Sequence, residues 1–123
     1  MDKAQAIHEF WSSFNIPAYD QSSVPDGAVM PYITYEVSSG SVGAVLTLSA
    51  SVWYRTSSWV DISRKVAEIG EKLGSEGFYI GEVDGGYMWA VQGDTFAQRM
   101  TDPADDMIRR YYLQVSAEFL TAY

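Results

Sequence analysis

The stretch from Met107 to Thr121 alternates between two kinds of side chain with a period of two. Through its middle the odd positions are apolar and the even positions are mostly polar, which is typical of a half-buried β-strand. At about 3.3 Å per residue the strand would reach roughly 50 Å, longer than a domain of this size needs. Two explanations stay open: a bulge or break near residues 108–110, or a part or exposed edge of the strand that pairs with another copy of the chain.

The first part of the chain predicts one helix and a long connection. Asp2 can cap a helix over residues 2–14, and Gln5, three positions later, completes a capping-box pattern. Residues 15–31 contain three prolines and an Asp-Gly turn dipeptide. They are therefore expected to form a long connection without regular structure, of the kind that is often functional or ordered only by a partner.

A second helix is predicted over residues 58–74. Ser58 and Asp61 form a capping-box pattern, and Gly74 stands where a helix-ending glycine belongs. Asp61 and Glu68 each precede a lysine by four positions, which favours ion pairs on the exposed side. The apolar seam of this helix, which we expect to cover a sheet, consists of Trp59, Ile62, Val66, Ile69 and Leu73.

Strands account for most of the remaining chain. From their alternation and composition, the predicted strands are 31–37, 44–54, 78–80, 87–91 and 107–121. The first two form an antiparallel hairpin around the flexible loop 38–43, and the next two form a hairpin around Asp84-Gly85-Gly86. Residues 93–100 are ambiguous and are compatible with an extension of the fourth strand.

The order helix, hairpin, helix, hairpin, strand predicts an α+β fold. We expect a mostly antiparallel sheet of about five strands with two helices packed on one face. With 123 residues and no break in composition, the chain is expected to form a single domain over residues 1–123.

Acidic residues outnumber basic ones by 16 to 8, which gives a formal net charge of −8. Only Arg64-Lys65 and Arg109-Arg110 are adjacent, and polyanion binding relies on clustered bases, so a nucleic-acid-binding surface is not expected. No cysteine is present, which excludes disulfides and thiolate metal sites. The N-terminus lacks the pattern of a secretory signal and no apolar stretch is long enough for a membrane span, so we expect a soluble intracellular product.

Groups capable of catalysis are few. His8 is the only histidine in the sequence, and no serine lies in a nucleophile-elbow pattern. We therefore expect His8 to be solvated or to pack against the core. Asp102, Asp105 and Asp106 lack the alternating ligands and distal Glu of a calcium loop. The glycine-rich stretch 81–86 leads into a strand, whereas a phosphate-binding loop leads into a helix. We therefore assign no catalytic, cofactor-binding or metal-binding residue and do not expect an enzyme.

Several short segments follow one another in a recognisable order. They are Val24-Pro25-Asp26-Gly27, Met30-Pro31-Tyr32-Ile33-Thr34-Tyr35, Val52-Trp53-Tyr54, Ser57-Ser58-Trp59, Trp89-Ala90-Val91-Gln92-Gly93, Asp105-Asp106 and Arg110-Tyr111-Tyr112-Leu113-Gln114-Val115. This order resembles that of the tail terminator, or tail completion, proteins of long-tailed bacteriophages and related prophages. The resemblance covers most of the chain, roughly Val24 to Phe119.

The resemblance implies an α+β subunit that assembles into a homo-oligomeric ring, commonly hexameric. Such a ring caps the head-proximal end of the tail tube, stops tube polymerisation and provides the surface that docks on the head connector. It implies partners among the tail tube and head connector proteins, a place in the virion at the head-tail junction after synthesis in the bacterial cytoplasm, and no cofactor. The acidic charge and the nine Tyr, five Phe and four Trp, residue types that are enriched at interfaces, are compatible with this reading.

Interface residues are expected at three places if the chain assembles in this way. They are the loop 38–43, Arg99, and the solvent-facing side of the last strand. The assigned residues are Ser39, Gly40, Ser41, Val42, Arg99, Arg110 and Tyr112.

Two alternatives stay open at this point. The chain resembles other head-tail connector, stopper or minor tail proteins in its size and α+β composition. A small-molecule-binding regulatory domain is the alternative from a different class, and it would need a pocket lined by apolar groups with a few convergent polar ones.

Overall fold

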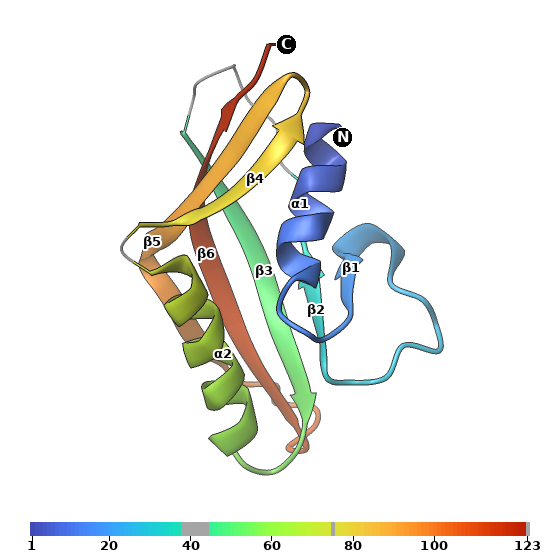
Figure 1. Ribbon diagram of the computed structural model, residues 1–123. Helices are drawn as coiled ribbons and strands as arrows, with labels where there is room; N and C mark the ends of the chain where they lie inside the picture. Colours follow the sequence, from blue (N-terminus) through green and yellow to red (C-terminus); the bar gives the residue numbers. More distant parts are fainter. Residues whose placement is uncertain (38–44, 75, 123) are drawn as a thin grey trace.

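The computed structural model of this chain describes residues 1–37, 45–74 and 76–122. Two α-helices and a mixed sheet make up these ranges (Figure 1). In chain order the elements are α1 (Lys3–Ser12), β1 (Ala18–Asp20), the 3-10 helix η1 (Gln21–Ser23), β2 (Tyr32–Tyr35), β3 (Val45–Arg55), α2 (Val60–Leu73), β4 (Phe78–Val83), β5 (Gly86–Met100) and β6 (Ile108–Leu120). The predicted α+β class and both predicted helices are confirmed.

Within the described ranges the sheet has six strands in the order β1-β2-β3-β6-β5-β4. All neighbouring pairs are antiparallel except β1 and β2, which run parallel. Both predicted hairpins are confirmed, and β5 does extend through the ambiguous stretch to Met100. The strand missing from the prediction is the short edge strand β1.

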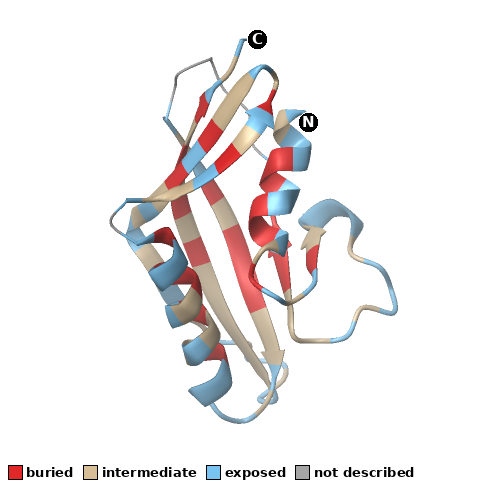
Figure 2. Cartoon of the chain, in the orientation of Figure 1, coloured by how far each residue is buried: buried red, intermediate tan, exposed pale blue. Residues whose placement is uncertain are grey.

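Both helices pack on the same face of the sheet (Figure 1). The side chains that β3 and β6 turn toward the helices, such as Val52 and Val115, are fully buried, as Ile7 of α1 and Ile69 of α2 are. Figure 2 shows buried positions in red along the middle strands and on the sheet-facing sides of the helices. No helix of the described residues covers the opposite face of the sheet, and we call it the open face.

The central strand β6 runs unbroken from Ile108 to Leu120, so the predicted bulge near residues 108–110 is wrong. The irregularity lies in β5 instead, where Gln92 stands opposite Val115 and Ala97 opposite Leu113. The expected exposed edge is also wrong, because β3 and β5 pair with the two sides of β6 over most of its length. The strand can be long because two neighbours of similar length flank it.

The connection 15–31 is not structureless, and this prediction is wrong. Ala18–Asp20 form a strand that pairs with Ile33–Tyr35, and the side chain of Ala18 is buried in the core. Asp20 then caps η1 by accepting a hydrogen bond from the Ser22 backbone N–H at 2.9 Å. A three-residue strand is too short to show an alternation, so its partner β2 decides its structure.

The start of α2 also differs from the predicted capping box. Trp59 occupies the N-cap, and Ser58 Oγ accepts a hydrogen bond from the Val60 N–H without forming a capping box with Asp61. The two expected lysine pairs are replaced, because Lys65 Nζ lies 2.6 Å from Glu68 and also donates to the Phe14 carbonyl, and Lys72 donates to the Ser13 carbonyl. Tertiary contacts with the end of α1 thus redirect the lysines. Gly74 ends the helix as predicted.

Candidate functional site

One end of the sheet carries an arginine–tryptophan cluster, which consists of Trp59, Arg99, Arg109 and Tyr111. The guanidinium carbon of Arg99 lies 4.7 Å from the centre of the Trp59 ring, and that of Arg109 lies 5.4 Å from it. Tyr111 meets Trp59 edge to face with ring centroids 5.6 Å apart. Cation–π contacts of this kind hold a guanidinium in place while leaving its edge available.

Arg99 and Arg109 use their nitrogens differently. Arg109 donates to the backbone carbonyls of Asp106 and Ser57, each at 2.7 Å, and so ties two loops together. Arg99 is exposed and donates only its Nε–H, to the Tyr111 hydroxyl at 3.0 Å. In the described ranges neither arginine forms an ion pair; the paired bases are Arg55, Arg64 and Lys65. The two terminal nitrogens of Arg99 are therefore open to an external acceptor.

The electrostatics of the cluster are set by this unneutralised positive charge. The hydrogen bond from Arg99 holds the pKa of Tyr111 below its usual value, and a hydrogen bond with Ser63 acts in the same direction. A charged donor strengthens such a hydrogen bond relative to a neutral one. The cluster is thus a fixed cationic patch suited to a carboxylate.

The other two predicted interface residues on strands lie on the open face. Arg110 stands opposite Trp53 of β3, with its guanidinium carbon 4.8 Å from the Trp53 ring centre, and donates to Ser51 Oγ at 3.0 Å. Tyr112 stands between Ser51 and Gln98. Both are half-buried, because they cover the polar Ser51 on the open face.

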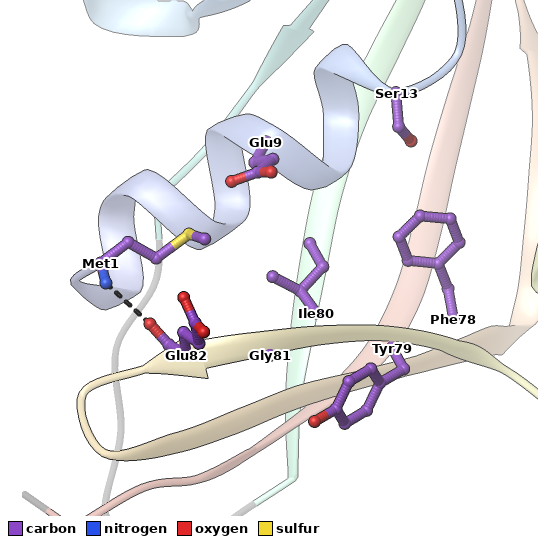
Figure 3. Close-up of a pocket in the computed structure, with 8 residues that line it drawn as sticks. All are labelled: Met1, Glu9, Ser13, Phe78, Tyr79, Ile80, Gly81 and Glu82. Atoms are coloured by element: carbon purple, nitrogen blue, oxygen red, sulfur yellow. Dashed lines mark hydrogen bonds between the residues drawn. The ribbon is translucent and has the colours of Figure 1, made fainter.

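At the other end of the molecule a groove runs between α1 and β4 (Figure 3). It has a volume of about 630 Å³. Its lining residues are Met1, Glu9, Ser13, Phe78, Tyr79, Ile80, Gly81 and Glu82. Glu9 and Glu82 reach this groove from α1 and β4 respectively, and we call it the acidic groove. The amino group of Met1 is also there, and donates to the Glu82 carbonyl oxygen at 2.7 Å.

The hairpin turn beside the acidic groove is held at several points. Glu82 and Asp84 adopt positive φ angles of 60° and 44°. The Asp84 N–H donates to the Met1 carbonyl, and the Ala122 N–H donates to the Asp84 carbonyl, each at 2.9 Å. Because segments from both ends of the described chain clamp this turn, Glu82 is presented on a fixed backbone.

Near the same end the open face exposes large apolar side chains. Val45 is 68% exposed, Tyr79 is 60% exposed and Trp89 is 41% exposed. The register places them in one row across the sheet, with Glu118 of β6 between Val45 and Trp89. Exposed apolar groups in a row are typical of interaction surfaces.

His8 forms hydrogen bonds that join a helix to the sheet. His8 Nδ1 lies 2.7 Å from the Tyr35 hydroxyl, and His8 Nε2 lies 3.3 Å from Ser12 Oγ, so the ring bridges α1 to β2. Among the hydrogen bonds of the described residues, none joins His8 to a carboxylate, whereas a serine triad requires such a bond.

Within the described ranges no three His, Cys, Asp or Glu side chains are grouped to hold a metal ion. None of the helices there is long and apolar enough to cross a membrane.

The predicted interface residues are brought together only in part. Arg99, Arg110 and Tyr112 lie at the same end of the sheet, but Arg99 is on the helix-covered face and the other two are on the open face. Ser39, Gly40, Ser41 and Val42 lie outside the described residues. Whether any of them contacts a partner stays a prediction.

Sequence reasoning missed Trp59 as a platform for Arg99, and it missed the acidic groove. The sequence predicts Trp59 only as part of the helix seam, and there it does pack, half-buried, against the core. The row on the open face had a signal in the sequence, because Tyr79, Tyr87 and Trp89 alternate with the buried Ile80, Met88 and Ala90. The acidic groove had no signal in the sequence, because Glu9 and Glu82 are far apart along the chain.

Comparisons with known proteins bear on the fold. A scan of protein-family models finds no match for this chain, and a search of curated proteins finds none either. Among solved structures, the fold is similar to that of a chain in the "Virion of native gene transfer agent (GTA) particle". The similarity covers 94% of this chain and 95% of that chain, with a TM-score of 0.54 and 17% sequence identity. At a sequence identity of 17%, this comparison shows that the two chains share a fold.

Proposed function

We propose that this chain is a structural subunit of a phage-like virion, and that it acts as a tail terminator, or tail completion, protein. In this role copies of the chain form a ring, for which the family resemblance implies six subunits, at the head-proximal end of the tail tube. The ring ends tube polymerisation and joins the tail to the head connector. It performs no catalysis and needs no cofactor.

The observation that carries this proposal is the fold shared with a chain of a gene transfer agent virion. The similarity extends over nearly the full length of both chains, so it concerns the whole architecture and not one common motif. The order of segments from Val24 to Phe119 independently resembles the tail terminator family. Fold alone does not determine function, so the specific role depends on both lines together.

The surface of the molecule is compatible with assembly. The arginine–tryptophan cluster and the row of Val45, Tyr79 and Trp89 are the kinds of group that are enriched where proteins meet. The net charge of −8 disfavours adhesion to DNA, which suits a ring through which DNA passes. These properties support a role in assembly over a role in catalysis.

Deletion of the coding sequence from the genome that carries it tests the proposal. Particles produced without this chain should show unjoined heads and tails whose lengths vary and exceed normal in negative-stain electron microscopy. A copy supplied in trans should restore both length and joining. Unjoined tails of normal, uniform length would contradict termination and favour a connector or stopper role. Joined particles with normal tails would contradict both.

The oligomeric part of the proposal has its own measurement. Light scattering of the purified protein across a wide concentration range should show a closed species near six times the 13.7 kDa chain mass. Mass that keeps rising with concentration would indicate open polymers and would contradict a ring.

A further inference from the structure

We propose that the acidic groove of one copy binds the Arg99 guanidinium of a second copy. The ring in which this contact would recur depends on the proposed function, but the contact itself depends only on the two surfaces. Its two halves are Glu9 and Glu82 on the groove, and Arg99 of the arginine–tryptophan cluster. The occupant of the groove is therefore a second copy of this chain.

The acidic groove carries more negative than positive groups. Glu9 on α1 and Glu82 on β4 line the same groove, and neither forms an ion pair in the described part of the chain (Figure 3). The amino group of Met1 is already directed at the Glu82 carbonyl oxygen and not at a carboxylate. The two carboxylates outnumber the one amino group in the groove, so the groove attracts a further positively charged group.

Arg99 has the matching geometry. Its guanidinium stacks on Trp59 at 4.7 Å and donates its Nε–H to Tyr111, which fixes the plane of the group before any partner binds. The remaining nitrogens form a fork that can donate to carboxylate oxygens in parallel. Because the side chain is already ordered, binding costs less conformational entropy than it would for a free surface arginine.

The acidic groove and Arg99 lie at opposite ends of the long strands. Gly86 begins β5 beside the groove, and Arg99 is the last residue but one of that strand. Along β6, the distance from Arg110, near Arg99, to Leu120, near the turn, is roughly 33 Å at about 3.3 Å per residue. Arg99 of one copy therefore cannot reach the groove of the same copy. Contacts between different patches on successive copies generate rings when the rotation closes.

The charge balance favours a protein partner over nucleic acid. Arg99 and Arg109 are the only bases of the cluster, and Arg109 is committed to backbone carbonyls. Phosphate backbones are held by many such bases, whereas one arginine fork matches a pair of carboxylates. A chain with 16 acidic residues supplies carboxylates on every copy.

A charge exchange between two variants tests this contact. The first variant is R99E, and the second is E9R/E82R. Each variant alone brings like charges together, so its self-association should weaken by roughly 30-fold or more. An equimolar mixture restores opposite charges at both kinds of contact and should regain the mass of the unmodified protein. The measurement is analytical ultracentrifugation at low salt, with circular dichroism to verify that each variant is folded.

Matched controls separate the contact from net charge. R64E makes the same change as R99E at an exposed helix position, and E71R/E76R makes the same change as the groove variant away from the groove. Both controls should associate like the unmodified protein. The single variant E9R, at an exposed position of α1, replaces E9R/E82R if the double variant does not fold.

The outcomes separate the contact from the ring. Variants that associate as tightly as the unmodified protein, or a mixture that fails to recover, would overturn the contact while leaving the ring in place. An unmodified protein that stays monomeric at every concentration would overturn the contact, whereas tail length in the deletion experiment would still test the function. A mixture that stops at two chains would support the contact and contradict the ring.

Discussion

At Gly86 the backbone of β5 passes too close to β6 for any side chain. A Cβ atom placed there would overlap the carbonyl oxygen of Leu120 and lie 2.9 Å from the Thr121 Cα. These backbone atoms belong to the last residue of β6 and to the residue after it, so they cannot move aside as the end of a flexible side chain would. Glycine at the start of β5 is therefore required by the close approach of the two strands.

Gly86→Ala should lower the free energy of unfolding by about 1–3 kcal/mol, because the added methyl group forces a backbone shift. Urea denaturation measures the change. Gly27→Ala is the control, since no atom lies within 4 Å of a Cβ at Gly27. It should change stability far less than Gly86→Ala does. Equal effects at the two positions would show that the approach of β6 is not the cause.

At the scale of single elements, α1 holds the sheet through an aromatic cluster. The centroid of the Phe10 ring lies 4.8 Å from that of Trp11 and 5.4 Å from that of Phe14. It lies 5.3 Å from the ring centroid of Phe78, which belongs to β4. Edge-to-face pairs of this kind add to the stabilisation from burial. Since α1 also forms one wall of the acidic groove, its docking on β4 sets the position of Glu9 relative to Glu82.

Phe10→Ala should lower the free energy of unfolding by about 3–5 kcal/mol, because it leaves a cavity among buried rings. Chemical denaturation monitored by tryptophan fluorescence gives the value. Ser12→Ala, at an exposed position of the same helix, should have little effect and controls for changes in helix propensity. A cost below about 1 kcal/mol at Phe10 would mean that the helix is not an integral part of the core.

At the scale of the whole molecule, β6 is the centre and β1 and β4 are the edges. β6 pairs with β3 and β5 and contributes Leu113, Val115, Ala117 and Phe119 to the core. β1 has three residues and one partner. Stability within such a sheet is expected to fall from the centre outward, because local opening requires fewer contacts to break at an edge.

Hydrogen exchange of the native protein should therefore be slowest in β6 and fastest, among the strands, in β1. Exchange of the central amides should require global unfolding, whereas those of Ala18–Asp20 should exchange through local opening. Mass spectrometry of peptic fragments resolves these segments. Exchange of β6 ahead of β1 would contradict the strand order.

Much of the element pattern could be predicted from the sequence. Alternation over Met107 to Thr121, the seam from Trp59 to Leu73 and the turn at Asp84 are local patterns, and each corresponds to a local structure. The missing strand β1 and the redirected Lys65 depend on partners from elsewhere in the chain. Of the candidate site, the sequence marked Arg99 as an interface residue, but it contained no sign of the Trp59 ring beneath it.

By itself, the sequence determined which segments become the two helices and the longer strands and which faces of them are buried, because the period of apolar residues is imposed by backbone geometry. Tertiary structure alone decided that β6 inserts between β3 and β5, that β1 joins β2, and that Glu9 and Glu82 share one groove. These arrangements join residues far apart in the chain. Their positions depend on packing of the whole core, which no local pattern records.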